Sequence, residues 1–69
     1  MKIKEIRESS TEELVARKRE LRESAFQLRL QKKLGQLEKP SQIKAVRREI
    51  ARIETVLNER RRAQEAAKA

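Results

Sequence analysis

The sequence predicts an all-α protein, a long antiparallel two-helix hairpin preceded by a short N-terminal helical turn. Three observations lead to this fold class. Apolar residues recur at helical spacing along two long stretches. The 69 residues include a single glycine, Gly35, and a single proline, Pro40, which together mark one break in the chain. A short connection between two long helices favours antiparallel packing, so we expect one small domain over 1–69.

The first long helix is expected over 10–34. It begins at the stretch "STEE", where the Ser10 hydroxyl can accept a hydrogen bond from the backbone N–H of Glu13 and the Glu13 side chain can reach back. No helix breaker follows before Gly35. Residues 1–9 precede this helix and can form a short turn whose Ile3 and Ile6 fold onto the hairpin.

The loop is expected over 35–39 and the second long helix over 40–61. Gly35 suits the position just past a helix end, and Pro40 suits the first turn of the next helix. Lys39 would then be the N-cap although it offers no side-chain acceptor, so the alternative is a boundary shifted by about one residue. Residues 62–69 are polar and alanine-rich, and we expect this tail to fray.

The two helices are predicted to meet along one apolar seam. Its residues share a narrow arc of each helix when they are placed at about 100° per residue. The seam residues are Leu14, Leu21, Ala25 and Leu28 on the first helix and Ile43, Val46, Ile50, Ile53 and Leu57 on the second. Lys18 and Lys32 intrude near this arc, where their stems can lie along apolar surface with the ammonium in water.

A second apolar group on the first helix does not fit this seam. It consists of Val15, Phe26, Leu30 and Leu34. A two-helix hairpin has only one interior, so two interpretations remain open for these residues. Either Ile3, Ile6 and Leu37 fold over parts of the group, or the group is a contact surface for another macromolecule.

The composition excludes most kinds of catalytic or metal site. The chain has no Cys and no His, so a disulfide, a thiol nucleophile, an imidazole base and a Cys/His zinc site are ruled out. One glycine cannot form a Gly-rich phosphate loop. Glu12 and Glu13 fit the first turn of a helix, where they complement its dipole. We therefore expect no enzyme activity, no catalytic residue, no metal and no cofactor.

The charge balance indicates a polyanionic partner. Lys and Arg total 19 against 11 Asp and Glu, which gives a net charge of +8 and a pI near 10.6. Such a balance favours nucleic acid or an anionic membrane surface. No apolar run approaches the roughly 20 residues of a membrane span and no signal peptide is visible, so we expect a soluble, cytoplasmic protein. A single aromatic, Phe26, cannot provide a stacking platform for a single strand.

The second helix concentrates positive charge opposite its seam. Lys44, Arg48 and Arg52 stand one turn apart on one arc without an interleaved acid, although like charges at this spacing repel. The arc is either a solvated face or a surface for a polyanion, with Ala51 permitting close approach. Arg and Lys bind phosphates and Gln adds neutral hydrogen bonds, which favours a shape-and-backbone mode on folded RNA. The candidate RNA-binding residues are Gln27, Arg29, Lys32, Lys33, Gln36, Lys44, Arg47, Arg48, Arg52 and Thr55.

Three stretches of the chain are also typical of a known family. They are "KIKEIRESSTEEL", "AFQLRLQKKLGQLEKPSQI" and "VRREIARIETVLNER". In this order and spacing the chain resembles the bacterial-type large-subunit ribosomal protein twenty-nine family over nearly its whole length. The family's recurrent segments fall on 26–29, 35–38 and 46–55 of this sequence. The family often has Asn before the loop proline, so Lys39 departs from its pattern and puts the N-cap in doubt.

This resemblance implies a fold and a function. The fold is a long antiparallel hairpin with a short N-terminal helical turn, in agreement with the prediction from the residues. The function is that of a structural constituent of the large ribosomal subunit, which binds its rRNA near the polypeptide exit tunnel and contributes to translation. The implied neighbours are the ribosomal protein numbered twenty-three and, nearby, signal recognition particle and trigger factor.

The residues alone leave one alternative function open. A basic helical hairpin could be an adaptor that binds an acidic protein or an anionic membrane surface. Membrane binding is disfavoured because it should favour bulky apolar anchors opposite the basic arc, whereas the apolar stripe there is expected to pack against the partner helix. Self-association is not expected.

Overall fold

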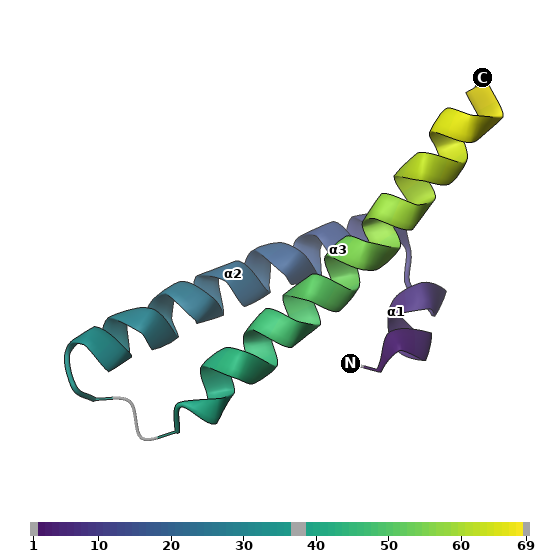
Figure 1. Cartoon of the computed structure of the whole chain (residues 1–69). Coiled ribbons are helices and arrows are strands. Elements are labelled where there is room, and N and C mark those ends of the chain that lie inside the picture. The colour runs from purple at the N-terminus through teal and green to yellow at the C-terminus, as the bar shows by residue number, and fades with distance from the viewer. Residues whose placement is uncertain (1, 37–38, 69) are drawn as a thin grey trace.

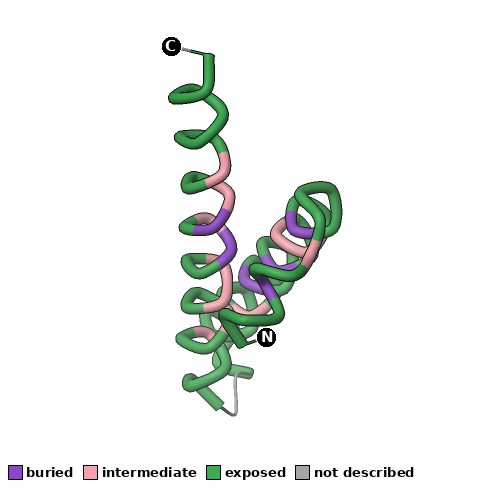
Figure 2. Tube along the Cα trace, turned by 90° about the vertical axis from the view of Figure 1, so that its right-hand side faces the viewer, coloured by how far each residue is buried: buried purple, intermediate pink, exposed green. Residues whose placement is uncertain are grey.

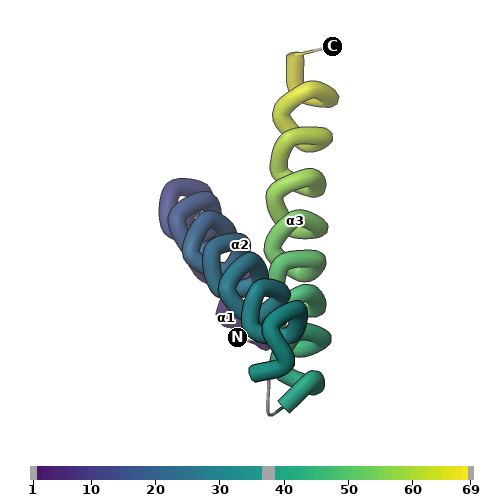
Figure 3. The backbone as a smooth tube through the Cα atoms, turned by 90° about the vertical axis from the view of Figure 1, so that its left-hand side faces the viewer, coloured from purple at the N-terminus to yellow at the C-terminus, as the bar shows by residue number. Residues whose placement is uncertain are grey.

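The structure, a computed structural model, describes residues 2–36 and 39–68 and folds them into three helices. α1 spans Ile3–Glu8, α2 spans Thr11–Lys33 and α3 spans Ser41–Lys68. Helices α2 and α3 run antiparallel and cross at an open angle, and α1 lies beside α3 (Figure 1, Figure 3). The molecule is elongated, with extents of 51 × 20 × 16 Å. The predicted all-α hairpin with a short N-terminal helix is therefore confirmed.

Local hydrogen bonds define both ends of α2. The Ser10 hydroxyl accepts a bond of 3.1 Å from the backbone N–H of Glu13, as the "STEE" stretch predicts. At the other end Gly35 has a φ of +73°, a backbone conformation that favours glycine. The backbone N–H of Gly35 donates to the carbonyl of Lys32 and that of Gln36 to the carbonyl of Gln31, at 3.1 and 2.8 Å. These two bonds form a Schellman motif, so Gly35 ends α2 as expected.

Helix α3 differs from the expected 40–61 at both ends. It begins at Ser41, and its first turn is closed by bonds of 3.1 and 3.2 Å from the backbone N–H groups of Gln42 and Ile43 to the carbonyls of Lys39 and Pro40. It continues to Lys68 rather than stopping at Arg61, and this end projects beyond the other helices (Figure 1). Residues 61–68 contain strong helix formers and neither Gly nor Pro, which explains the continuation.

The core lies between α2 and α3, where the buried and half-buried residues of the two helices lie on their facing sides (Figure 2). Of the predicted seam, Leu14, Leu21, Ala25 and Ile53 are buried, and Leu28, Ile43, Val46, Ile50 and Leu57 are half-buried. Val56 is buried in the same cluster as Ile6, although the predicted seam did not include it. Lys18, which was expected to run along the seam, is half-buried and places its Nζ 3.4 Å from Glu54.

Helix α1 is held against the hairpin by apolar and polar contacts. Ile6 is fully buried, as a residue that folds onto the hairpin should be. The Arg7 guanidinium donates to both carboxylate oxygens of Glu59, at 2.8 and 3.3 Å. The Arg60 guanidinium donates to the backbone carbonyls of Arg7 and Ser9, at 3.1 and 2.7 Å, and to the Thr11 hydroxyl at 3.1 Å. Arg60 thus satisfies carbonyl groups that the end of a short helix leaves unpaired.

Candidate nucleic-acid interface

The basic arc predicted on the second helix exists as an exposed row on α3. Lys44, Arg48 and Arg52 are all exposed and follow one another at intervals of one turn. None of the three takes part in an ion pair with a described residue. Thr55 continues the row, and its hydroxyl donates to the carbonyl of Ala51 at 2.8 Å. We call Lys44, Arg48, Arg52 and Thr55 the outer row.

The acidic residues of α3 lie away from the outer row. Glu49 contacts Arg17 at 3.5 Å, and Glu54 contacts both Lys18 and Arg22, at 3.4 and 3.1 Å. These ion pairs join α2 to α3 along the edges of the seam. Glu49 and Glu54 therefore form ion pairs with cations of α2 instead of neutralising the outer row. The positive charge of the outer row remains available to a partner.

The surroundings of Glu49 shift the pKa of its carboxyl group. Burial, which leaves 14% of its side chain exposed, acts to raise this pKa. Hydrogen bonds and charge from cationic groups beside it, Arg17 among them, act in the opposite direction and prevail. The net effect lowers the pKa of Glu49 below its ordinary value of 4.5, so the carboxylate is charged at neutral pH.

The remaining candidate RNA-binding residues lie in two other places. Arg29 and Arg47 line one narrow groove between α2 and α3. Gln27, Lys32 and Lys33 are exposed on the C-terminal half of α2, and Gln36 is exposed in the turn that follows. The ten candidates thus comprise the four residues of the outer row, two residues of the groove and a loop-proximal cluster of Gln27, Lys32, Lys33 and Gln36.

A family model described as "Ribosomal L29 protein" matches residues 4–60, which cover α1 except for its first residue, all of α2 and most of α3. The chain belongs to the ribosomal L29 protein family. It is therefore a ribosomal protein with a structural rather than an enzymatic role. The projecting end of α3, residues 61–68, lies outside the matched range.

Individual L29 relatives are similar over nearly their full length. The large ribosomal subunit protein uL29 of Fusobacterium nucleatum is 53% identical over 60 residues, which cover 87% of this chain and all of the relative. The protein of the same name from Natranaerobius thermophilus is 52% identical over 87% of this chain and 92% of its own length. That from Enterococcus faecalis is 52% identical over 86% of this chain and 95% of its own length.

The second apolar group of this L29 chain is exposed. Phe26 and Leu34 expose 63% and 62% of their surface, and Val15 and Leu30 expose 45% and 43%. Ile6 is buried with Leu14 and Ile53 instead of covering this group, and Ile3 is itself exposed. The cover expected from Leu37 lies outside the described residues. The four side chains are thus accessible to a partner, and their role as a protein-contact surface stays a prediction.

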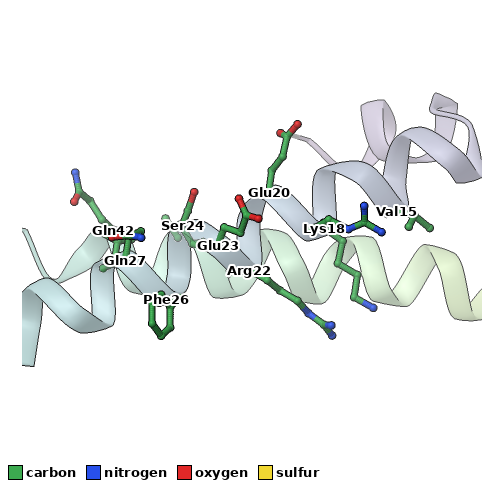
Figure 4. Close-up of a pocket in the computed structure, with 13 residues that line it drawn as sticks. Val15, Lys18, Glu20, Arg22, Glu23, Ser24, Phe26, Gln27 and Gln42 are labelled. Carbon is green, nitrogen blue, oxygen red and sulfur yellow. The ribbon is translucent and has the colours of Figure 1, made fainter.

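One hollow beside α2 of this L29 chain is open to solvent rather than enclosed. The hollow is lined by side chains that point to opposite sides of α2, with Glu20 and Ser24 on one side and Arg22 and Phe26 on the other (Figure 4). Over residues 2–36 and 39–68, no group of acidic side chains is arranged to hold a metal ion. None of the helices in these ranges combines the length and hydrophobicity that a membrane crossing requires.

Sequence reasoning missed two residues that shape this L29 fold. Glu59 and Arg60 hold α1 in place, yet both look like ordinary surface residues in the sequence. One signal was present, because Arg60 lies close to the seam on the helical wheel and therefore faces the other helices.

Proposed function

We propose that this chain is a structural constituent of the large ribosomal subunit that binds large-subunit rRNA near the polypeptide exit tunnel and so contributes to translation. Membership of the ribosomal L29 protein family is the observation that carries this proposal. The relatives carry the name of a large-subunit protein, which supports a place for this chain on the cytoplasmic ribosome. The place near the exit tunnel rests on the resemblance described above.

The charge distribution supports RNA as the direct partner. The net charge of +8 is not spread evenly, because Glu49, Glu54 and Glu59 of α3 pair with cations of α1 and α2, while the outer row has no ion pair with a described residue. Counterions released from RNA phosphates would favour binding at such a row. The loop-proximal cluster of Gln27, Lys32, Lys33 and Gln36 adds further phosphate and sugar donors.

Neighbouring proteins form the second part of the proposal. Of the four exposed apolar residues expected to contact protein, Val15, Leu30 and Leu34 keep this role in the proposal, because solvent-exposed apolar surface on so small a chain usually indicates an interface. The fourth, Phe26, lines a groove together with the cations Arg29 and Arg47. The resemblance gives ribosomal protein twenty-three as the neighbour. Signal recognition particle and trigger factor would dock nearby.

Gradient sedimentation and crosslinking test this function. A tagged chain would be expressed in a bacterium that lacks its own member of the family. We expect the chain to sediment with large subunits, to crosslink to large-subunit rRNA and to crosslink to ribosomal protein twenty-three. A chain that remains outside the subunits and crosslinks to an acidic protein or to membranes would instead support the adaptor function.

A further inference from the structure

A groove runs between α2 and α3, and its lining includes exposed residues that do not belong to the core of the hairpin. Arg22, Ala25, Phe26 and Arg29 line it from α2, and Arg47, Ile50, Ala51 and Glu54 line it from α3. Helix α1 contributes no residue to it. We call this surface the Phe26 groove.

The Phe26 groove combines an apolar surface with unpaired positive charge. Ala25, Ile50 and Ala51 contribute apolar side chains to its lining, and Phe26 keeps 63% of its surface exposed. Arg22 contacts Glu54 at 3.1 Å, so these two charges offset each other. Arg29 and Arg47 have no such partner in the described chain, and the groove therefore carries two uncompensated cations.

The two free cations stand on different helices. Arg29 follows Phe26 by three residues, so both lie on neighbouring parts of the same face of α2. Arg47 enters from α3, four residues before Ala51. A ligand in the groove would meet an aromatic ring and small apolar side chains in its centre and a guanidinium from each helix.

We propose that the Phe26 groove binds one unpaired nucleotide of the large-subunit rRNA, with its base stacked on Phe26 and its flanking phosphates bound by Arg29 and Arg47. The proposal rests on the function proposed above and assigns it a specific site. The exposed Phe26 ring can stack on a nucleotide base. Such stacking tolerates any base, because every base has a π-face. Guanidinium groups bind phosphate oxygens in a bidentate manner. A protein segment would need an apolar side chain together with two carboxylates, whereas one nucleotide and its flanking phosphates supply a flat base and two negative charges.

Only one base is expected in the groove. Phe26 is the only aromatic residue of the sequence, so there is no ring on which a following base could stack. This agrees with the absence of a platform for a continuous single strand. The occupant is therefore a single extruded nucleotide within folded RNA.

Ultraviolet crosslinking of assembled subunits tests this site directly. Large subunits that contain the full chain are irradiated and digested with trypsin and nucleases. Cleavage after Arg22 and Arg29 releases the peptide 23–29, which contains Phe26. We expect this peptide to carry the mass of a nucleotide on Phe26. If other peptides of the chain carry RNA while 23–29 is unmodified or linked to a protein, the groove proposal is wrong and the RNA-binding function stands. If the chain is missing from the subunits, the proposed function itself fails.

Two substitutions separate stacking from simple apolar contact. Phe26→Leu keeps an apolar side chain without the ring, and Phe26→Tyr keeps the ring. Affinity is measured by filter binding to a transcript of large-subunit rRNA at fixed salt. We expect Phe26→Leu to weaken binding about tenfold and Phe26→Tyr to change it less than about twofold. Both variants should melt like the parent, because Phe26 is largely exposed. Equal affinities for the two variants would overturn the stacking proposal.

A charge variant tests the phosphate contacts. Arg47→Gln should weaken binding of the transcript, because Arg47 lines the groove. The matched control is Arg62→Gln, which removes the same charge from an exposed residue on the projecting end of α3. Equal losses in the two variants would mean that net charge alone matters, and Arg47 would not hold a nucleotide.

Discussion

Ile50 and Ile53 occupy the same apolar face of α3 at different depths. Ile53 is fully buried, whereas Ile50 is half-buried at the edge that faces the Phe26 groove. Truncation of a fully buried isoleucine removes the transfer free energy of its methyl groups and leaves a cavity. We predict that Ile53→Ala lowers the free energy of unfolding by about 2–4 kcal/mol. Ile50→Ala should cost less, and thermal melts followed by circular dichroism would compare the two.

A loss for Ile50→Ala that equals or exceeds the loss for Ile53→Ala would contradict this ranking. It would mean that the groove side of α3 is packed more tightly in solution than its exposure suggests. For a chain of 69 residues, even the smaller change is a substantial part of the total stability.

The lowered pKa of Glu49 makes one contribution to stability dependent on pH. A carboxyl group whose pKa is lower in the folded chain stabilises the fold above its ordinary value of 4.5 and loses this effect as the pH falls through the lowered value. We predict that Glu49→Gln destabilises the chain at neutral pH by less than about 1 kcal/mol, because its partner Arg17 is partly exposed. The difference from the parent should shrink as the pH falls below 4.5.

Glu65→Gln is the matched control for this experiment. It removes the same charge from an exposed side chain whose contact with Arg61 is 3.9 Å long. Its effect on the melting temperature should be small at both ends of the pH range. A Glu49→Gln difference that stays constant on acidification would argue against a stabilising role for the charged carboxylate.

Helical periodicity predicted single residues well where they face the partner helix. Leu14, Leu21 and Ile53 are buried as expected, since their spacing fixes their positions around each helix. It could not predict that Glu49 would meet Arg17. Such a contact depends on how far each helix is rotated and shifted relative to the other, and one sequence carries no direct signal for either quantity.

At the scale of the elements, α1 depends on the hairpin for its structure. A helix of six residues is far too short to be stable alone. Its burial of Ile6 and the Arg60 bonds to the carbonyls of Arg7 and Ser9 therefore hold it in place. We predict that Arg60→Gln speeds hydrogen exchange about tenfold or more in residues 3–9, since each lost bond contributes on the order of 1 kcal/mol.

Exchange measured by mass spectrometry should leave α2 and the middle of α3 unchanged in this variant. Arg62→Gln removes the same charge two residues further on and should not affect α1. Unchanged protection of residues 3–9 in Arg60→Gln would show that Ile6 and the Arg7–Glu59 pair are sufficient to hold the helix.

The ends of the helices show what local sequence signals can and cannot predict. The Ser10 cap and the Gly35 turn were predictable because each depends on the chemistry of a few adjacent residues. The end of α3 was not, because no stop signal follows Arg61 and the expectation of fraying relied on composition alone.

At the scale of the whole molecule, folding separates the charges of the chain. The acids Glu49, Glu54 and Glu59 face α1 or α2, and the outer row faces away from these contacts. The periodicity of α3 predicted this row. It did not predict that Arg47, adjacent to Arg48 in the chain, would line the Phe26 groove with Arg29, because a groove requires two correctly placed helices.

The last prediction concerns the salt dependence of RNA binding by the outer row. Each phosphate contact releases counterions, so the logarithm of the affinity falls linearly with the logarithm of the salt concentration, with a slope that grows with the number of contacts. Replacing Arg48 and Arg52 together by Gln should reduce this slope by about 1–2. Binding of large-subunit rRNA transcript would be measured over a range of salt concentrations.

The control is the double variant Arg62→Gln with Lys68→Gln, which lowers the net charge by the same amount at the projecting end of α3. A long-range effect of net charge would change the slope equally in both double variants. Direct contact by the outer row would change it only when Arg48 and Arg52 are replaced. An unchanged slope in that variant would remove the outer row from the RNA-binding surface and leave the Phe26 groove and the loop-proximal cluster as the remaining candidates.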